Sequence, residues 1–289
     1  MPRSSYVNGR YVPHFQATVH IEDRGFQFAD GVYEVIGVFG GCLIDGEEHL
    51  DRLERSLKEL RMDAPLGRTS LILIMQETLR RNHVQNGKIY IQISRGVATR
   101  DHPFPATSES SLIVTASPGS WLSQSEAKTG SAVVTGPDLR WRRCDIKSVS
   151  LLPNLLAKQT AVEAGAAELW MTDDNDLVTE GTASNAWIVT LDEEIITRQT
   201  DDGILAGITR QTLIRLIERE GYKLTLRAFT VEEAKAAKEA FFTSATAIVK
   251  PVTSIDGDSV GNGAPGEITC QLIDLYFDHM HQTRAHHGQ

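Results

Sequence analysis

The sequence has few cysteines, and they are poorly placed for cross-links or metal binding. Cys42, Cys144 and Cys270 are the only three in 289 residues, and no two have CxxC spacing. An odd, widely spaced set forms neither a disulfide framework nor a zinc site, so we interpret them as reduced thiols in a reducing compartment. Histidines near the C-terminus, such as His279 and His281, fit a frayed polar end better than a metal site. We therefore predict no metal.

The sequence also lacks the long apolar runs of membrane proteins and the positive charge of nucleic-acid-binding proteins. No apolar stretch approaches the ~20 residues that a membrane helix requires, and the first nine residues contain no apolar signal-peptide core. The net charge is −9, whereas nucleic-acid binding normally needs a concentrated positive surface. We expect a cytoplasmic protein whose partners include neither a membrane nor a nucleic acid.

What the sequence does contain is typical of a globular protein of substantial size. Hydrophobic residues make up 41% and charged residues 23% of 289 positions, enough for one large domain or two smaller ones. Small and polar residues over 118–130 suggest a linker, so we predict an N-terminal α/β domain over 1–117 and a C-terminal domain over 131–289. Helices and strands alternate irregularly, without the βαβ rhythm of a doubly wound sheet, which favours an α/β fold of the α+β type.

Turn and periodicity signals predict the individual elements. Asn8-Gly9 predicts a hairpin over 6–12, because this pair readily adopts the positive φ of a tight turn, and Gly40-Gly41 predicts another between strands 32–39 and 42–44. Leucines at helical spacing predict an amphipathic helix over 47–62. A helix over 69–83 and strands over 89–95 and 112–116 follow. In the C-terminal half we expect strands near Val133, Leu169, Trp187 and Phe241, and helices over 155–164, 208–220, 231–238 and 268–281.

Lys147 stands in a segment with an unusual mixture of charge. Arg140, Arg142 and Arg143 precede it, and apolar residues follow it. Nearby cations and apolar surroundings favour a neutral amine, the form that makes a Schiff base with a carbonyl. The alternative is an ordinary solvated lysine beside other surface charges.

Two other segments carry residues suited to a phosphorylated ligand. Glu180 and Ser184 lie within TEGTASN over 179–185, which is either a plain turn or an acid facing a cofactor with small residues around it. At Gly207-Ile208-Thr209-Arg210 a helix begins, and its free N–H groups with the Thr209 hydroxyl could bind a phosphate. The alternative is a simple N-cap, which Thr209 alone would supply.

Three cationic residues could be either ordinary surface charges or ligand contacts. Arg52 lies among acidic residues on a predicted helix, where a surface salt bridge is the default role. Arg100 and His102 lie on a Pro-rich loop, and they either grip a carboxylate or are ordinary exposed loop charges.

In their order along the chain, these segments resemble the fold-type IV (class IV) pyridoxal-phosphate aminotransferases, most closely the D-amino acid aminotransferase branch. The resemblance runs from DRGFQFADGVYEV over 23–35 to AFFTS over 240–244, with CDIKS over 144–148 and TEG over 179–181 between them. The loop RGVATRDHPFP over 95–105 points to the D-amino acid branch. The resemblance implies an N-terminal α/β sandwich, a C-terminal pseudo-barrel and a homodimer.

The resemblance also implies site roles. Lys147 is implied to hold pyridoxal 5'-phosphate through a Schiff base and to move the substrate proton, and Glu180 to keep the pyridine nitrogen protonated. The further implied cofactor contacts are Arg52, Ser184, Ile208, Thr209 and Thr246. The implied contacts to the substrate carboxylate are Tyr33, Tyr90, Arg100 and His102, some of them from a second subunit.

The chain departs from the family pattern around the phosphate. Ala245 stands where relatives often have a hydroxyl residue, so that contact is either missing or moved to Thr246. IVKP over 248–251 replaces the commoner acid-Ile-Thr-Pro, and TAS over 182–184 replaces what is often a run of serines.

The implied reaction is transfer of an amino group from a D-amino acid, such as D-alanine or D-glutamate, to 2-oxoglutarate or pyruvate. A branched-chain L-amino acid aminotransferase is an alternative, since it shares Lys147 and Glu180 but does not need Arg100 and His102. An aminodeoxychorismate-type lyase and a non-catalytic binder of the same fold stay open as well.

Overall fold

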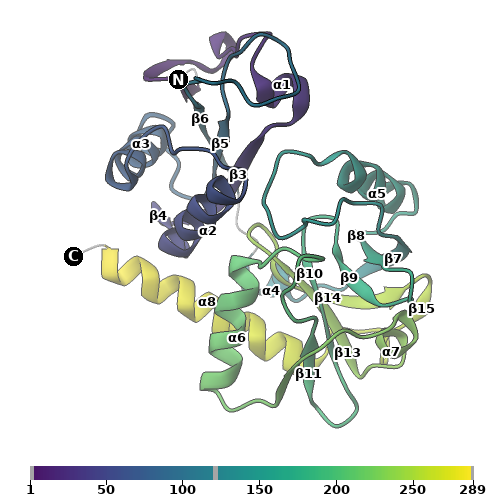
Figure 1. Ribbon diagram of the computed structural model, residues 1–289. Helices are drawn as coiled ribbons and strands as arrows, with labels where there is room; N and C mark the ends of the chain where they lie inside the picture. The colour runs from purple at the N-terminus through teal and green to yellow at the C-terminus, as the bar shows by residue number, and fades with distance from the viewer. Residues whose placement is uncertain (1–2, 120–122, 288–289) are drawn as a thin grey trace. The chain divides into compact units, whose positions relative to one another are not determined.

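The computed structural model describes residues 3–119 and 123–287 (Figure 1). The chain forms two compact units. The first unit comprises Met1–Trp121, Ile146–Ser150 and Thr283–Gln289, and the second comprises Leu122–Asp145 and Leu151–Gln282. The short stretch that carries Lys147 therefore belongs with the N-terminal part of the chain, although segments of the second unit precede and follow it in the sequence.

The first unit is built on an antiparallel sheet in the order β2-β1-β6-β5-β3-β4. Its two predicted hairpins are confirmed: Asn8 and Gly9 turn with φ of 44° and 88°, and Gly40 and Gly41 with φ of 58° and 83°. Positive φ at both central residues matches the right-handed twist of the flanking strands. The strands are β1 Ser4–Val7, β2 Arg10–Pro13, β3 Gly31–Phe39, β4 Cys42–Leu43, β5 Gly87–Ser94 and β6 Ser111–Pro118.

Helices α2 (Gly46–Glu59) and α3 (Arg68–Arg81) pack on one face of this sheet (Figure 1). Leu50, Leu53 and Leu57 lie on one side of α2 and are buried, which confirms the predicted amphipathic helix. They share a core with the inward residues of β3 and β5. The turn η1 (His14–Gln16) and the short helix α1 (Arg24–Phe28) precede β3.

The second unit contains a nine-stranded sheet with the path β12-β11-β10-β13-β14-β7-β8-β9, and β15 pairs with β14 outside this path. Because β9 returns to lie beside β10, the sheet curls into a half-barrel. Its core contains stacked Trp187 and Phe241 rings and a Trp170–Phe229 edge contact. The strands are β7 Ser131–Pro137, β8 Glu168–Thr172, β9 Val178–Gly181, β10 Asn185–Val189, β11 Ile195–Thr197, β12 Leu224–Leu226, β13 Glu239–Ser244, β14 Ile248–Ile255 and β15 Asp258–Ser259.

Among the described residues, five helices accompany the half-barrel, and four of them lie close to their predicted positions. These are α5 Leu152–Glu163, α6 Ile208–Arg219, α7 Val231–Lys235 and α8 Glu267–His287. The fifth, α4 (Gln124–Ala127), lies inside the stretch predicted as a linker, where Ser123 caps it with a capping box. Positions 120–122 of that stretch lie outside the described residues. No helix in the described part of the chain is long and apolar enough to cross a membrane.

Candidate active site

The backbone of the Lys147 segment is hydrogen-bonded to β3. The Lys147 carbonyl accepts a hydrogen bond from the Tyr33 amide at 3.0 Å, and the Val149 amide donates to the Gly31 carbonyl at 3.0 Å. The Lys147 Nζ lies 4.3 Å from the centre of the Tyr33 ring. No carboxylate in the described part of the first unit forms an ion pair with this amine, so its nucleophilic atom is left for a ligand.

Tyr33 and Tyr90 extend from neighbouring strands on the face of the sheet opposite α2. Their rings are 5.8 Å apart, and the Tyr90 hydroxyl donates to Gln92 Oε1 at 2.6 Å. Burial and the neighbouring Tyr33 raise the pKa of Tyr90 to about 12, so it stays a neutral hydrogen-bond donor. Gln92, which sequence reasoning missed, fixes where that hydroxyl points.

Arg52 is buried and paired, contrary to the default expectation of a surface salt bridge. Its Nε and Nη2 both bond to Glu34, at 2.8 Å each, and His49 Nδ1 lies 2.7 Å from the same carboxylate. Burial alone raises the pKa of Glu34, but Arg52 and His49 outweigh burial and lower the pKa to about 2. The pair therefore gives α2 a fixed cation, and the phosphate role of Arg52 stays a prediction.

Arg100 and His102 lie on an exposed loop and share one aromatic neighbour. The Arg100 guanidinium is 5.1 Å from the centre of the Phe28 ring, and the His102 ring is 5.7 Å from it. Among the described residues, no hydrogen bond or ring contact links either side chain to Tyr33 or Tyr90. The first unit thus presents two separate groups of predicted substrate residues.

Glu180 in the second unit is completely surrounded by donors. Arg140 forms a short ion pair with it, Asn185 Nδ2 donates at 2.9 Å, and the Leu205 amide lies 3.1 and 3.2 Å from its two oxygens. Arg140 also bonds to Asp138 at 2.6 Å. Burial raises the pKa of Glu180, and Arg140 with the Leu205 amide counters part of that rise.

Ser184 faces a second buried acid. Its Oγ donates to Glu168 Oε2 at 3.0 Å, and the Thr182 hydroxyl bonds to the other oxygen of the same carboxylate. Asn154 on α5 donates to the Thr182 carbonyl at 2.8 Å. The turn after Glu180 is therefore held rigidly between Glu168 and α5, and the cofactor contact of Ser184 stays a prediction.

The N-terminus of α6 is suited to bind an anion. Its N-cap is Gly207, with no side-chain cap, so the interpretation of Thr209 as a plain N-cap is wrong. Ile208 and Thr209 occupy the first turn, and uncapped N–H groups there attract negative charge. A Cβ at Gly207 would collide with the Asn185 amide oxygen, so glycine keeps α6 close to the Glu180 network.

The turn from β13 to β14 contains Thr246, which is exposed. The Ser244 hydroxyl accepts a hydrogen bond from the Ala247 amide at 3.0 Å, and Ile248 adopts a φ of 60°. A left-handed conformation is unusual for a β-branched residue and marks local strain. The strained residue therefore lies in the same turn as Ala245, where the sequence departs from the family pattern.

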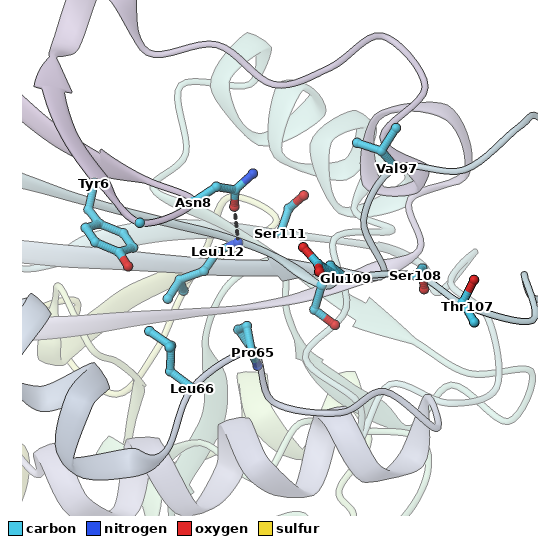
Figure 2. Close-up of a pocket in the computed structure, with 12 residues that line it drawn as sticks. Tyr6, Asn8, Pro65, Leu66, Val97, Thr107, Ser108, Glu109, Ser111 and Leu112 are labelled. Atoms are coloured by element: carbon cyan, nitrogen blue, oxygen red, sulfur yellow. Dashed lines mark hydrogen bonds between the residues drawn. The ribbon is translucent and has the colours of Figure 1, made fainter.

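An open groove of the first unit lies away from these residues. It encloses about 710 Å³ beside the ends of β1 and β6, and none of the predicted site residues lines it. Figure 2 shows the Leu112 amide donating to the Asn8 side-chain oxygen, at 2.7 Å, on the rim of this groove. We therefore build the candidate site on the Lys147 and Glu180 clusters.

Comparison with known proteins shows the family of the chain. The model of the family "Amino-transferase class IV" matches residues 31–255. The chain belongs to the class IV aminotransferases. It is 40% identical over 262 residues to a D-alanine aminotransferase of Bacillus licheniformis, covering 91% of this chain and 92% of that one. A D-alanine aminotransferase of Listeria innocua is 36% identical and covers 94% of each chain.

Solved structures of class IV aminotransferases share the fold. A branched-chain amino acid aminotransferase from the archaeon Thermoproteus uzoniensis, solved with norvaline, superposes with a TM-score of 0.83 and 26% identity, covering 96% of this chain and 94% of that one. A T.th. branched-chain amino acid aminotransferase with pyridoxamine 5'-phosphate gives a TM-score of 0.88 at 26% identity, with the same coverage. The predicted fold class is confirmed: a class IV aminotransferase has the same two-sheet α/β architecture, one sheet curled into a half-barrel.

Sequence reasoning missed the residues that hold the predicted ones in place. Glu34 and His49 fix Arg52, and Arg140 and Asn185 fix Glu180. Arg140 was visible in the sequence as one of three arginines before Lys147, but nothing in that run indicated a partner 40 residues away.

Proposed function

We propose that the protein is a pyridoxal-phosphate-dependent aminotransferase that moves the amino group of a D-amino acid, such as D-alanine or D-glutamate, to 2-oxoglutarate or pyruvate. Family membership and the D-alanine aminotransferases at 36–40% identity support this activity. The observation that carries it is the lysine amine of Lys147, which has a defined backbone position and no carboxylate partner in the described part of its unit.

The residues of each unit fit the cofactor's functional groups. The buried, anionic end of the Arg140–Glu180 pair suits a protonated ring nitrogen, and the α6 N-terminus with Ile208 and Thr209 suits a phosphate. Arg52, Ser184 and Thr246 are proposed as the remaining contacts. When bound, pyridoxal phosphate supplies an aldehyde that takes the amino group and a ring that accepts electrons from Cα.

Lys147 carries the proton in this proposal. Its amine removes the proton from the substrate Cα, because no acidic partner in the described part of its unit holds it as an ammonium ion. Glu180 must be ionised for this step, because its negative charge favours the protonated ring nitrogen. Tyr33 and Tyr90 would orient the substrate, with the Tyr90 hydroxyl kept neutral as a donor.

Handedness is proposed to depend on Arg100 and His102, which would hold the substrate α-carboxylate. Both are exposed and have no hydrogen-bond contact with Tyr33 or Tyr90 among the described residues, so we propose that they act in the site of a second subunit. A homodimer is further supported by an exposed apolar stripe on α5, which the described residues of its unit do not cover. The stripe consists of Leu152, Leu155, Leu156 and Val162.

We propose a cytoplasmic location because the cysteines are unpaired. Cys42, Cys144 and Cys270 are all free thiols in the structure. Unpaired cysteines are expected in a reducing compartment.

Alanine isomers test the activity directly. The purified protein should show a visible absorption band from lysine-bound cofactor, which Lys147→Ala removes. Adding D-alanine should abolish this band and L-alanine should leave it unchanged. A response to L-valine and not D-alanine would favour a branched-chain enzyme, and absence of the band after incubation with the cofactor would favour a non-catalytic binder.

A further inference from the structure

One buried guanidinium holds the backbone of the loop that carries Arg100 and His102. Arg24, on α1, is 4% exposed. Its Nη1 donates to the carbonyls of Asp101 at 2.7 Å and Pro103 at 3.4 Å, and its Nη2 donates to the His102 carbonyl at 3.3 Å. Three consecutive carbonyls therefore converge on a single side chain, which fixes the curvature of the loop at His102.

Asp30 fixes Arg24 in turn. Its carboxylate accepts from Arg24 Nε at 2.8 Å and from Arg95 at 2.7 and 3.0 Å. Burial alone raises the pKa of Asp30, but the two arginines outweigh burial and hold the pKa below its usual range. Arg95 also donates to the carbonyls of Leu60 and Arg61 at 2.8 and 3.0 Å. The start of the loop is thus tied to the end of α2.

Phe28 connects the same helix to the loop's side chains. The Arg24 guanidinium lies 4.8 Å and the Arg100 guanidinium 5.1 Å from the centre of its ring. Helix α1 cannot move away easily, because Asp23 caps it and also accepts from Ser94 on β5 at 2.9 Å. A Cβ at Gly25 would lie 2.7 Å from Ser94 Cβ, so only glycine allows this close seating.

We propose that Arg24 is a positioning residue that holds the loop in the shape in which Arg100 and His102 bind the substrate α-carboxylate. This inference rests on the proposed function, because it requires those two residues to contact that carboxylate. Arg24 is buried, and its donors go to Asp30 and the loop carbonyls. It therefore acts through the loop and does not touch the substrate.

The test compares Arg24→Met and Arg24→Lys with wild type in the full-length protein loaded with cofactor. Hydrogen bonds from a charged donor contribute enough that Arg24→Met should raise KM for D-alanine by about 10- to 100-fold. The value of kcat and the affinity for the cofactor should change much less. Arg24→Lys should recover part of the loss, since lysine keeps the charge but not the planar fork.

A structural readout accompanies the kinetics. Hydrogen exchange should speed up in peptides covering 99–106 in the Arg24 variants and stay unchanged in peptides covering α5. Arg68→Met is the matched control: Arg68 bonds to Glu47, Asp51 and Glu54 in the same unit but is partly exposed and makes no hydrogen bond or ion pair with the described loop residues. Its KM and loop exchange should equal those of wild type.

Unchanged KM with unchanged loop exchange in both Arg24 variants would overturn the inference. So would a fall in kcat with cofactor loss at constant KM, which indicates general destabilisation. If Arg24→Met does not fold, Arg24→Lys and Phe28→Leu carry the test, with KM for D-alanine expected to rise in each. If wild type itself does not react with D-alanine, the proposed function fails, and loop exchange alone then decides whether Arg24 holds the loop.

Discussion

Each unit contains a buried glutamate paired with an arginine, and the two pairs differ in the charge that surrounds them. Glu34 receives two bonds from Arg52 and one from His49, and its pKa falls to about 2. Glu180 shares Arg140 with a second acid, Asp138, and its pKa is raised. Glu34 takes two bonds from Arg52, and this pair stabilises the fold. Glu180 accepts from several donors, but its arginine is shared with Asp138, so an additional positive partner would offset the second negative charge. That difference favours Glu180 as the acid that faces the cofactor ring.

Removing the charge of Glu34 should produce the largest effect, and on stability. Glu34→Gln removes the buried negative charge that accepts two bonds from Arg52, which should lower the free energy of unfolding by about 3–5 kcal/mol. Chemical denaturation monitored by circular dichroism measures this loss. A change below about 1 kcal/mol, the range of surface ion pairs, would show that the pair is not a structural element.

The direction of the Glu34 pKa shift determines how the stability of the protein depends on pH. The pKa of Glu34 is lowered in the folded protein, so its contribution is complete above the ordinary value of 4.5 and is lost as the pH falls toward about 2. The melting temperature of wild type should therefore fall more steeply over this interval than that of Glu34→Gln. Parallel curves for the two proteins would contradict the assignment.

Glu180→Gln should act on catalysis instead of the fold. An uncharged amide no longer favours the protonated ring nitrogen, so the rate of the D-alanine half-reaction should fall on the order of 100- to 1,000-fold. Single-turnover spectroscopy measures this rate, and the remaining side-chain oxygen can still accept from the Leu205 amide. Retention of more than a tenth of the wild-type rate would remove Glu180 from its proposed role.

Arg140 controls the ionisation of Glu180, because it lowers the pKa of Glu180 against the effect of burial. Arg140→Gln should raise that pKa further, so the ionised form appears only at higher pH. The acidic limb of kcat/KM against pH should then move to higher pH. Arg142→Gln, a change at an exposed neighbour, should leave the profile in place. If the acidic limb of the pH profile stays in place in both variants, Arg140 does not control the ionisation that catalysis requires.

The smallest effect is expected at an exposed arginine with several acidic partners. Arg68 contacts Glu47, Asp51 and Glu54, yet solvent screens these pairs. Arg68→Met should change the free energy of unfolding by less than about 1 kcal/mol, as judged by denaturant titration. A loss as large as that of Glu34→Gln would mean that the number of partners, and not burial, sets the strength of these pairs.

Elements with a local signal were predictable from the sequence. Asn8-Gly9 defined a hairpin, and Leu50, Leu53 and Leu57 defined α2, because turn geometry and helical spacing are properties of neighbouring residues. Strands such as β9 and β11 were missed, since they are short and buried at every position, so they show no alternation. The predicted linker over 118–130 contains α4, whose capping box is a local signal that was overlooked.

The residues of the candidate site also divide into those with a local sequence signal and those without one. Lys147 and Glu180 were identified through motifs, whereas their supporting residues depend on tertiary pairing. Arg140 reaches an acid 40 positions away, and Arg52 reaches one 18 positions away. Residue type alone cannot select one acid among the 38 in the chain.

The brief return of the chain to the first unit at Ile146–Ser150 restricts how the two units can be recombined. The chain is divided into five segments, so it passes between units four times. A chimaera of two relatives joined only at residue 121 would pair the β3 of one parent with the lysine segment of the other. Junctions on both sides of 146–150 are needed to inherit the lysine and its partner strand from a single parent.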